Sequence, residues 1–370
     1  MKTSTSILKN MLCFAIAIMT LGLSAQTIIT VDNNPGSTTT QQTIQEAIDA
    51  ATAGDIIYVQ PSGTSYGHAN VTKALTIVGR SHSENNRVST LGTVSIRSSN
   101  VTIKGINFGN LNFSATGASN PPPFVGTKIY ECEFASATLG ITSVLPVDAD
   151  DIEIRGNIIR SGITQYVDGI NVLISNNIFL GGSPLTIYDP TSIVVANNIF
   201  KYFSSGFNLT NQSSSGTVIL FNNMFIINET SDGTISFNNG PFNLSNCLTY
   251  NYGTGNISFT SNGSGSYLDS NTLSNTNPLF TDVDNTANQS FAGSSGYNPA
   301  FRPEDDLTLQ AGSPALTGGG GGSEIGLFNN GFNYKYLGNP RGVPVMDIIS
   351  YDGAVPKNGS INVTITSKAH

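Results

Sequence analysis

Three stretches of this sequence repeat one pattern: VLISNNIF at residues 172–179, IVVANNIF at 193–200 and VILFNNMF at 218–225. Each begins with alternating apolar positions, continues with two asparagines and ends on apolar residues. Alternation with a period of two is typical of a β-strand, and its recurrence at a longer, regular spacing is typical of a stacked array. The pattern therefore predicts a strand, a turn and the start of a second strand in every repeat.

Weaker copies of this pattern extend it along the chain at intervals of 20–26 residues. They lie at residues 101–108, 127–134, 152–159 and 242–249. Helical repeats of this length need Ala-, Leu- and Glu-rich stretches, and this chain is rich in Asn, Ser, Thr and Gly instead. We therefore predict an all-β protein, a right-handed parallel β-helix (β-solenoid) of roughly ten coils whose alternating apolar positions are buried.

The composition excludes one large class of function. Only 11% of the 370 residues are charged and the net charge is −8, whereas charged residues make up about a quarter of a typical soluble domain. Nucleic-acid binding needs clustered Lys and Arg. We therefore expect no nucleic-acid partner.

Residues 1–25 have the organisation of a secretory signal peptide. Lys2 and Lys9 flank the start, residues 11–23 are apolar, and Ser24 and Ala25 provide a small-residue cleavage site. No later stretch reaches the 18 apolar residues of a membrane-spanning helix. We expect an exported mature chain without a transmembrane segment, located outside the cell or on its surface, with the periplasm as the alternative.

The rest of the chain divides at about residue 330. Within residues 43–53, Ile44, Ala47, Ile48 and Ala51 follow helical spacing, so this segment predicts an amphipathic helix that caps the first coil. Residues 26–330 then form the β-helix domain. Residues 331–370 contain two alternating segments, 343–351 and 360–367, and predict a C-terminal β cap or a small β appendage.

Both ends of the predicted domain resemble a known family. The N-terminal TIQEAIDAATAGDIIYV (43–59) and NVTKALTIVG (70–79), with NPLF (277–280) and DLTLQAGSPA (306–315) at the far end, are similar to bacterial exported right-handed parallel β-helix proteins of the pectin-lyase-like fold. The resemblance covers roughly residues 27–330. The Asp-x-Gly and Asp-Ile-Gly that usually follow are replaced here by Thr317-Gly318 and Glu324-Ile325-Gly326. Because the family includes lyases, hydrolases and adhesins, the resemblance implies fold and export rather than one activity.

Asparagines fill two neighbouring columns after the first strand of the repeat. Amides stacked at a turn can hydrogen-bond to one another and to the backbone of adjacent coils. We assign this structural ladder to the first column, and glycan hydrogen bonding is the functional alternative. The first column contains Asn176, Asn197, Asn222 and Asn246, and the second contains Asn157, Asn177, Asn198 and Asn223.

The two cysteines that follow the signal peptide, Cys132 and Cys247, fall in one column of the repeat, five coils apart. That separation is roughly 24 Å at the usual strand spacing, which is too far for a disulfide. We predict two free, buried thiols.

One polar patch stands out among the outward positions of the predicted strands. It combines an aromatic ring for sugar stacking with cations for an acidic sugar, although an ordinary surface charge ladder would use the same residues. We name it as a candidate substrate-binding site. Its residues are Lys104, Lys128, Tyr130, Glu153 and Arg155, and Asp148, Asp150 and Asp151 lie beside it as candidate Ca²⁺ ligands.

The resemblance also bears on catalysis. Polysaccharide lyases of this fold act on the outer face of one sheet, with a cation that neutralises the uronate and an Arg or Lys base. Such an enzyme would use Arg155 or Lys128 here, but no lyase or polygalacturonase signature is recognisable in the sequence. We expect an exported, non-catalytic β-helix protein that binds a polysaccharide or another partner, or is structural, and that needs no cofactor unless Ca²⁺ is bound. The alternative is a lyase or hydrolase acting on an acidic, uronate-containing polysaccharide.

The outward positions further along the same face are apolar where solvent is expected. A loop at residues 228–240 that covers them is one explanation, and a partner surface is the other. The positions are Leu173, Val194, Ala196, Ile219 and Phe221.

Overall fold

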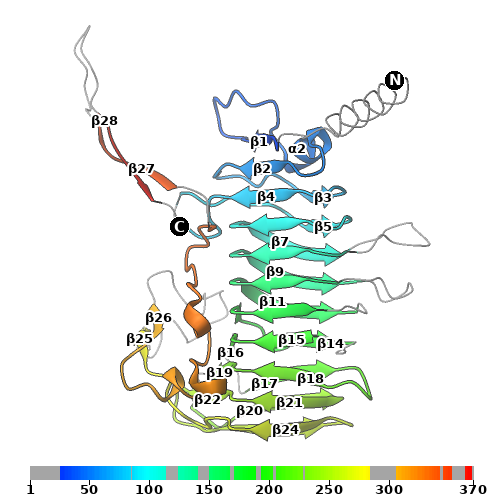
Figure 1. Ribbon diagram of the computed structural model, residues 1–370, viewed down its shortest axis with the longest axis vertical. Helices are drawn as coiled ribbons and strands as arrows, with labels where there is room; N and C mark the ends of the chain where they lie inside the picture. The colour runs from blue at the N-terminus through cyan, green and yellow to red at the C-terminus, as the bar shows by residue number, and fades with distance from the viewer. Residues whose placement is uncertain are drawn as a thin grey trace, which may run out of the picture.

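The protein is a parallel β-solenoid of about eight turns in the computed structural model (Figure 1). The structure describes residues 26–84, 86–113, 124–140, 150–166, 171–188, 193–202, 206–227, 230–283, 306–341, 345–351 and 363–368. The predicted all-β solenoid is confirmed. The expected ten coils were too many, because the chain leaves the solenoid after β24 and its C-terminal part turns back along the side.

The first of the two long sheets has 11 strands, paired in parallel along the solenoid axis. Its register agrees with the alignment of the repeats, since Lys128 pairs with Glu153 and Glu153 with Leu173. Its strands are β1 (Ile28–Val31), β2 (Ile56–Val59), β4 (Thr76–Gly79), β6 (Thr102–Lys104), β8 (Lys128–Tyr130), β10 (Glu153–Arg155), β12 (Val172–Ser175), β15 (Ile193–Ala196), β18 (Val218–Phe221), β21 (Pro241–Ser245) and β24 (Ser266–Ser270).

The second sheet has 13 strands and supplies the aromatic part of the interior. Phe179, Phe200 and Phe225 stack on successive turns, with ring centroids 4.7 and 5.1 Å apart. Its strands are β3 (Ala69–Val71), β5 (Val94–Ile96), β7 (Asn107–Phe113), β9 (Glu133–Leu139), β11 (Ile158–Gln165), β13 (Ile178–Phe179), β14 (Leu185–Ile187), β16 (Ile199–Tyr202), β17 (Gly206–Asn211), β19 (Met224–Ile227), β20 (Gly233–Asn239), β22 (Leu248–Asn251) and β23 (Ile257–Asn262). The expectation of a covering loop at 228–240 was wrong, because most of that segment is β20, paired on both sides within this sheet.

The N-terminal turn is covered by helix α2 (Ile44–Ala50). Thr43 caps it and Glu46 completes a capping box, and the helix buries Ile44, Ala47 and Ile48. The helix ends three residues before the predicted boundary. The Asp55 carboxylate accepts a hydrogen bond from the backbone N–H of Thr52, which draws the chain into a turn.

The asparagine ladder lies in the second column, one residue later than we assigned it. The Nδ2 groups of Asn157, Asn177 and Asn198 each donate to the Oδ1 of the asparagine in the next turn, over 2.9–3.0 Å. All of these side chains are fully buried. The predicted column instead occupies the turn itself, where Asn176, Asn197, Asn222 and Asn246 have φ of 52–59°. This left-handed conformation suits Asn and directs the following side chain, not its own, into the ladder.

The predicted free thiols are confirmed, and they lie at the two ends of this ladder. Cys132 and Cys247 are free and buried. The backbone N–H of Cys132 donates to the Oδ1 of Asn157, as an asparagine in the ladder would. Each thiol points at the carbonyl that an amide would otherwise reach, Ile103 for Cys132 and Leu220 for Cys247. Burial raises the pKa of both thiols to about 12.

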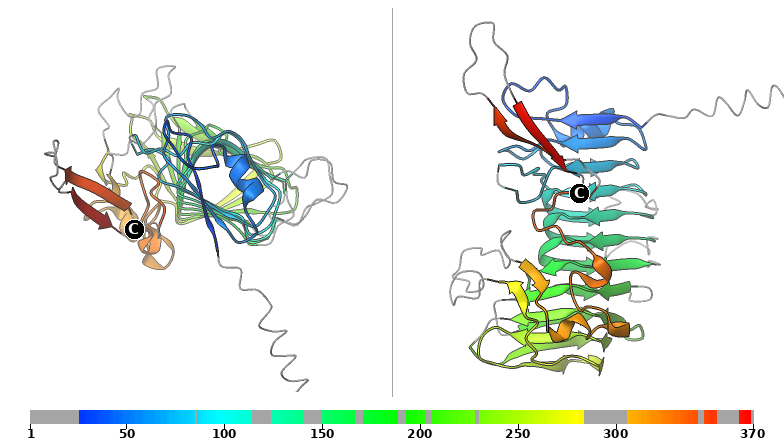
Figure 2. Two further views of the ribbon diagram at one scale, coloured as in Figure 1. Left: turned by 90° about the horizontal axis from the view of Figure 1, so that it is seen from above. Right: turned by 60° about the vertical axis from the view of Figure 1, so that its left-hand side comes forward.

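The C-terminal part of the chain runs back along the solenoid (Figure 2). After the antiparallel pair β25 (Phe280–Asp282) and β26 (Asp306–Leu309), residues 313–341 form a segment that we call the strap. It includes short 3₁₀ helices at Pro314–Leu316, Gly320–Gly322 and Asn329–Gly331. The expected C-terminal strands are present as β27 (Val345–Tyr351) and β28 (Val363–Lys368), which pair antiparallel.

Hydrogen bonds hold the strap along most of the solenoid. Asn222 accepts one from the Gly320 N–H, and Asn176 donates one to the Leu327 carbonyl. At the other end, the Leu337 carbonyl accepts from the backbone N–H of His82. The strap also buries a second apolar cluster, which joins outward side chains of the second sheet to its own: Ile178, Ile199, Met224 and Leu248 with Ile325, Leu327, Phe332 and Tyr334.

Candidate functional site

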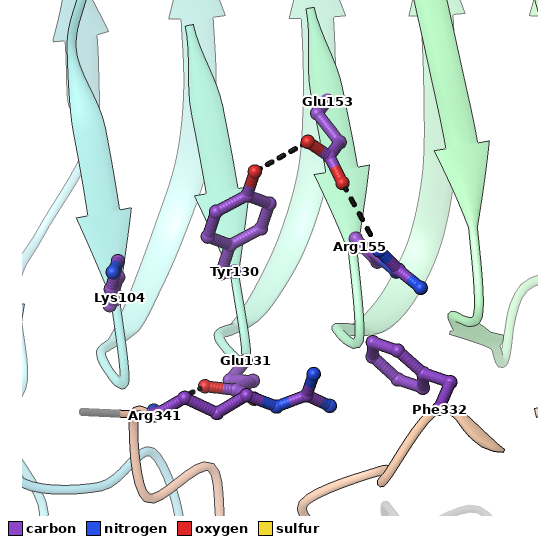
Figure 3. Close-up of a pocket in the computed structure, with 7 residues that line it drawn as sticks. All are labelled: Lys104, Tyr130, Glu131, Glu153, Arg155, Phe332 and Arg341. Atoms are coloured by element: carbon purple, nitrogen blue, oxygen red, sulfur yellow. Dashed lines mark hydrogen bonds and ion pairs between the residues drawn. The ribbon is translucent and has the colours of Figure 1, made fainter. Parts of the chain in front are cut away.

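Four of the five predicted patch residues line one pocket of about 220 Å³ on the outer face of the first sheet (Figure 3). Lys104, Tyr130 and Arg155 occupy paired positions on β6, β8 and β10, as the repeat alignment predicted. The strap closes one side. We call this the cationic pocket; it is lined by Lys104, Tyr130, Glu131, Glu153, Arg155, Phe332 and Arg341.

A hydrogen-bonded group forms one wall of the cationic pocket. The Tyr130 hydroxyl donates to Oε2 of Glu153 over 2.5 Å, and Nη1 of Arg155 lies 3.6 Å from Oε1 of the same carboxylate. The Nε of Arg155 donates to Oδ1 of Asn176 over 3.3 Å. Burial, reinforced by Glu153, raises the pKa of Tyr130 well above its ordinary value. Tyr130 therefore stays protonated and donates.

The opposite wall is supplied by the strap. The Phe332 ring lies 4.3 Å from Cζ of Arg155 and 4.2 Å from Cζ of Arg341, so both guanidinium groups stack on it. Phe332 thereby joins a cation of the solenoid to a cation of the strap.

Glu131 anchors Arg341 at this wall. Its Oε2 accepts from the Arg341 backbone N–H over 3.0 Å, and its Oε1 lies 2.8 Å from the Arg341 Nε. The Glu131 side chain is 5% exposed and that of Arg341 is 41% exposed. Burial of the carboxylate therefore outweighs the attraction of the solvent-screened Arg341, and the pKa of Glu131 is raised.

Glu131 also stands in an unusual backbone conformation. With φ of 53°, it occupies the left-handed turn position that Gly or Asn fills in the neighbouring coils. A residue other than Gly or Asn pays about 1 kcal/mol or more for this conformation. Its contacts with Arg341 offset that cost, so the chain keeps a strained residue at the site.

Lys104 remains available to a ligand. Its ammonium lies 5.9 Å from the centroid of the Tyr130 ring. Among the described residues it has no carboxylate partner within ion-pair distance. A ligand carboxylate can therefore reach an uncommitted cation in this pocket.

A larger groove of about 970 Å³ continues along the same face, and Glu153 borders both spaces. Lys128, the fifth predicted residue, lies in this groove. The outward apolar residues that the sequence showed are here as well: Val194 and Ile219 are 42% and 45% exposed, and Leu173 precedes them in the paired column. The other lining residues are Asp151, Ile152, Asn171, Val172, Ile193, Ser215, Gly216 and Thr217.

The remaining two outward apolar residues, Phe221 and Ala196, do not line the groove. Phe221 packs against Gly320 of the strap so closely that a side chain at Gly320 would overlap its ring. Ala196 is 6% exposed.

The described structure includes two of the three candidate Ca²⁺ ligands, Asp150 and Asp151. Asp148 lies outside the described residues, Asp151 borders the groove, and its Oδ1 accepts from Asn171 over 3.0 Å. The Asp150 carbonyl accepts from the Gly126 N–H. In the described ranges, no three His, Cys, Asp or Glu side chains gather as a metal-binding group.

Three residues that line the pocket were not identified from the sequence. Phe332 and Arg341 reach the site only because the strap folds back, and Glu131 was not singled out. The available signal was Glu131 itself, which stands in a column that is otherwise Gly or Asn from Gly105 to Asn271.

Sequence comparisons assign the chain to no group. It matches no protein-family model and no curated protein sequence. The described part of the chain contains no helix with the length and apolarity that a membrane crossing requires.

Proposed function

We propose that this is an exported, non-catalytic β-helix protein that binds an acidic polysaccharide on the outer face of its first sheet. The cationic pocket carries the proposal: three cations, Lys104, Arg155 and Arg341, surround two aromatic rings at one point of the solenoid. Guanidinium groups bind carboxylates bidentately, and the Tyr130 ring can stack on a sugar, while Phe332 holds Arg155 and Arg341 in place. Export rests on the signal sequence in residues 1–25.

The engagement of Tyr130, Arg155 and Glu131 by protein partners favours binding over catalysis. A lyase needs a base that can lose its proton near neutral pH. Tyr130 has a raised pKa, and the Arg155 guanidinium is held by Glu153, Asn176 and Phe332. The Glu131 carboxylate, which could otherwise serve a hydrolase as an acid, holds Arg341.

Isothermal titration calorimetry with residues 26–370 tests this proposal. The ligands are oligosaccharides containing glucuronate, galacturonate or mannuronate. We expect Arg155→Ala to weaken binding at least about tenfold, the cost of losing one charge-assisted contact. Arg87→Ala, which removes another partly exposed arginine that does not line the pocket, should bind normally. Absence of binding to every acidic oligosaccharide would refute the proposal.

A second assay separates binding from catalysis. Ultraviolet absorbance reports unsaturated uronate products, and a reducing-sugar assay reports hydrolysis. We expect no product in either assay, with or without Ca²⁺. A product that disappears in Arg155→Ala would make the protein a lyase or hydrolase that uses the same site.

A further inference from the structure

We infer that the ligand is a glycan with a single acidic sugar next to neutral sugars, and that the site discriminates against homopolymeric polyuronates. The inference rests on the proposed function, because it takes the cationic pocket and the groove as one binding site. It names the class of polysaccharide that this combination fits.

The two halves of the site differ in charge. The cationic pocket has three cations against the two carboxylates of Glu131 and Glu153. Glu153 also borders the groove, but it is bonded to Tyr130 and Arg155 of the pocket, and the groove's own charges are one cation, Lys128, against one carboxylate, Asp151. A carboxylate is therefore attracted to the pocket and gains no net attraction along the groove.

The groove is built for uncharged sugars. Leu173, Val194 and Ile219 pair on successive strands β12, β15 and β18, so they form a continuous apolar stripe. Neutral sugar rings present C–H faces that can cover such a stripe, whereas a carboxylate placed on it would lose water without gaining a cation. The exposed hydroxyls of Ser215 and Thr217 border the stripe and can bond to sugar hydroxyls.

The relative positions of the pocket and the groove set the order of the sugars. Phe332 and Arg341 wall off the cationic pocket at the carboxyl ends of the strands (Figure 3). The groove continues past Glu153 towards β18. From β8 to β18 the face crosses five adjacent strands, roughly 19 Å at the usual strand spacing. A short oligosaccharide would therefore place its acidic sugar in the pocket and its neutral sugars along the solenoid axis.

Matched pairs of tetrasaccharides test the inference by calorimetry. In each pair, one member has one terminal uronate and three neutral hexoses, and the other has four uronates; the gluco, galacto and manno series are compared. We expect the single-acid member of at least one pair to bind at least about tenfold more tightly than its partner. Asp151→Asn removes a negative charge from the groove, so it should narrow the difference in affinity between the two members of a pair. Asparagine tolerates the left-handed φ of 54° at this position.

Variants of the apolar stripe test whether the neutral sugars of the ligand bind there. Val194→Asp should weaken binding of the single-acid tetrasaccharide about tenfold and leave binding of the single uronate monosaccharide unchanged. Leu268→Asp is the matched control, because Leu268 is an exposed residue in the same column beyond the groove.

The outcomes separate this inference from the proposed function. If four-uronate members bind as tightly as, or more tightly than, the single-acid members and lose binding in Arg155→Ala, the proposed function stands and the inference is wrong. Equal loss with Val194→Asp and Leu268→Asp would also overturn it. If no member of any pair binds, both are refuted.

Discussion

Two neighbouring columns of asparagine differ in backbone conformation and in hydrogen-bond partners. Asn177, Asn198 and Asn223 face inward, are fully buried and bond to one another from turn to turn. The residues just before two of them, Asn176 and Asn222, sit in the left-handed turn and bond to the strap instead. The second column holds the coils together, whereas the first fastens a distant part of the chain to the solenoid.

The difference teaches that a repeat pattern locates a turn without stating which of its side chains face inward. Side chains of both columns form hydrogen bonds. The inward asparagines find their partners in the adjacent coils, which are always present. The partners of the outward column exist only where another segment docks. Substitutions in the two columns should therefore have effects of different size and reach.

The largest effect is expected for Asn198→Ala. The change removes hydrogen bonds from Asn198 to Ile174 and Asn223, and it leaves the backbone N–H of Asn177 without an acceptor. At about 1–3 kcal/mol for each buried polar group left unpaired, the free energy of unfolding should fall by about 3–5 kcal/mol. Urea denaturation followed by circular dichroism measures it.

Asn197→Gly is the control in the same turn. Glycine keeps the left-handed φ of 59°, and the Asn197 Oδ1 is a buried atom without a hydrogen-bond partner. The free energy of unfolding of Asn197→Gly should stay within about 1 kcal/mol of the wild-type value. Equal destabilisation by the two variants would contradict the assignment of the ladder to the second column.

An intermediate, pH-dependent effect is expected at two carboxylates next to the strap. Burial raises the pKa of Glu131 above its ordinary value of 4.5, so the stability that it contributes is lost as pH rises from that value. Burial also opposes ionisation of Glu133, but His82 and Arg160 prevail and lower its pKa. The contribution of Glu133 is therefore present above 4.5 and lost as pH falls.

Urea titrations of Glu131→Gln and Glu133→Gln at several pH values check these signs. The titration runs from about pH 4, near the ordinary glutamate pKa, to about pH 7. Over this range the stability of Glu131→Gln should increase relative to wild type. Glu133→Gln should lose most at neutral pH and least in acid. Parallel pH profiles for the two variants would contradict the opposite pKa shifts of these two carboxylates.

The smallest effect is expected at the ends of the ladder. Because burial raises the pKa of Cys132 and Cys247 to about 12, neither thiol should react with iodoacetamide in the folded protein at pH 8. Mass spectrometry should detect both adducts after denaturation in urea. Modification of either cysteine in the native protein would show that the end of the ladder opens readily.

The sequence predicted the parts of the molecule that depend on the repeat. Lys128, Glu153 and Leu173 occupy the column and register that their alignment indicated, because parallel stacking preserves sequence spacing from coil to coil. The same reasoning brought Lys104 and Tyr130 together at the site.

The parts that depend on the strap were not predicted. Phe332 and Arg341 are nearly two hundred residues or more from the strands they meet, and no periodicity connects them to those strands. The ladder was displaced by one residue for a related reason. Both columns are asparagine, and the left-handed φ that separates them is a property of the folded turn.

The strap also fixes the length of the molecule. Repeat proteins can gain or lose a coil because each contacts only its neighbours. Here one continuous segment bonds to Asn222 near one end and to His82 near the other, so an added or deleted coil between them would displace one attachment by about 4.8 Å. The strap thus acts as a ruler that fixes how many coils separate the two attachments, and it keeps Arg341 opposite Glu131.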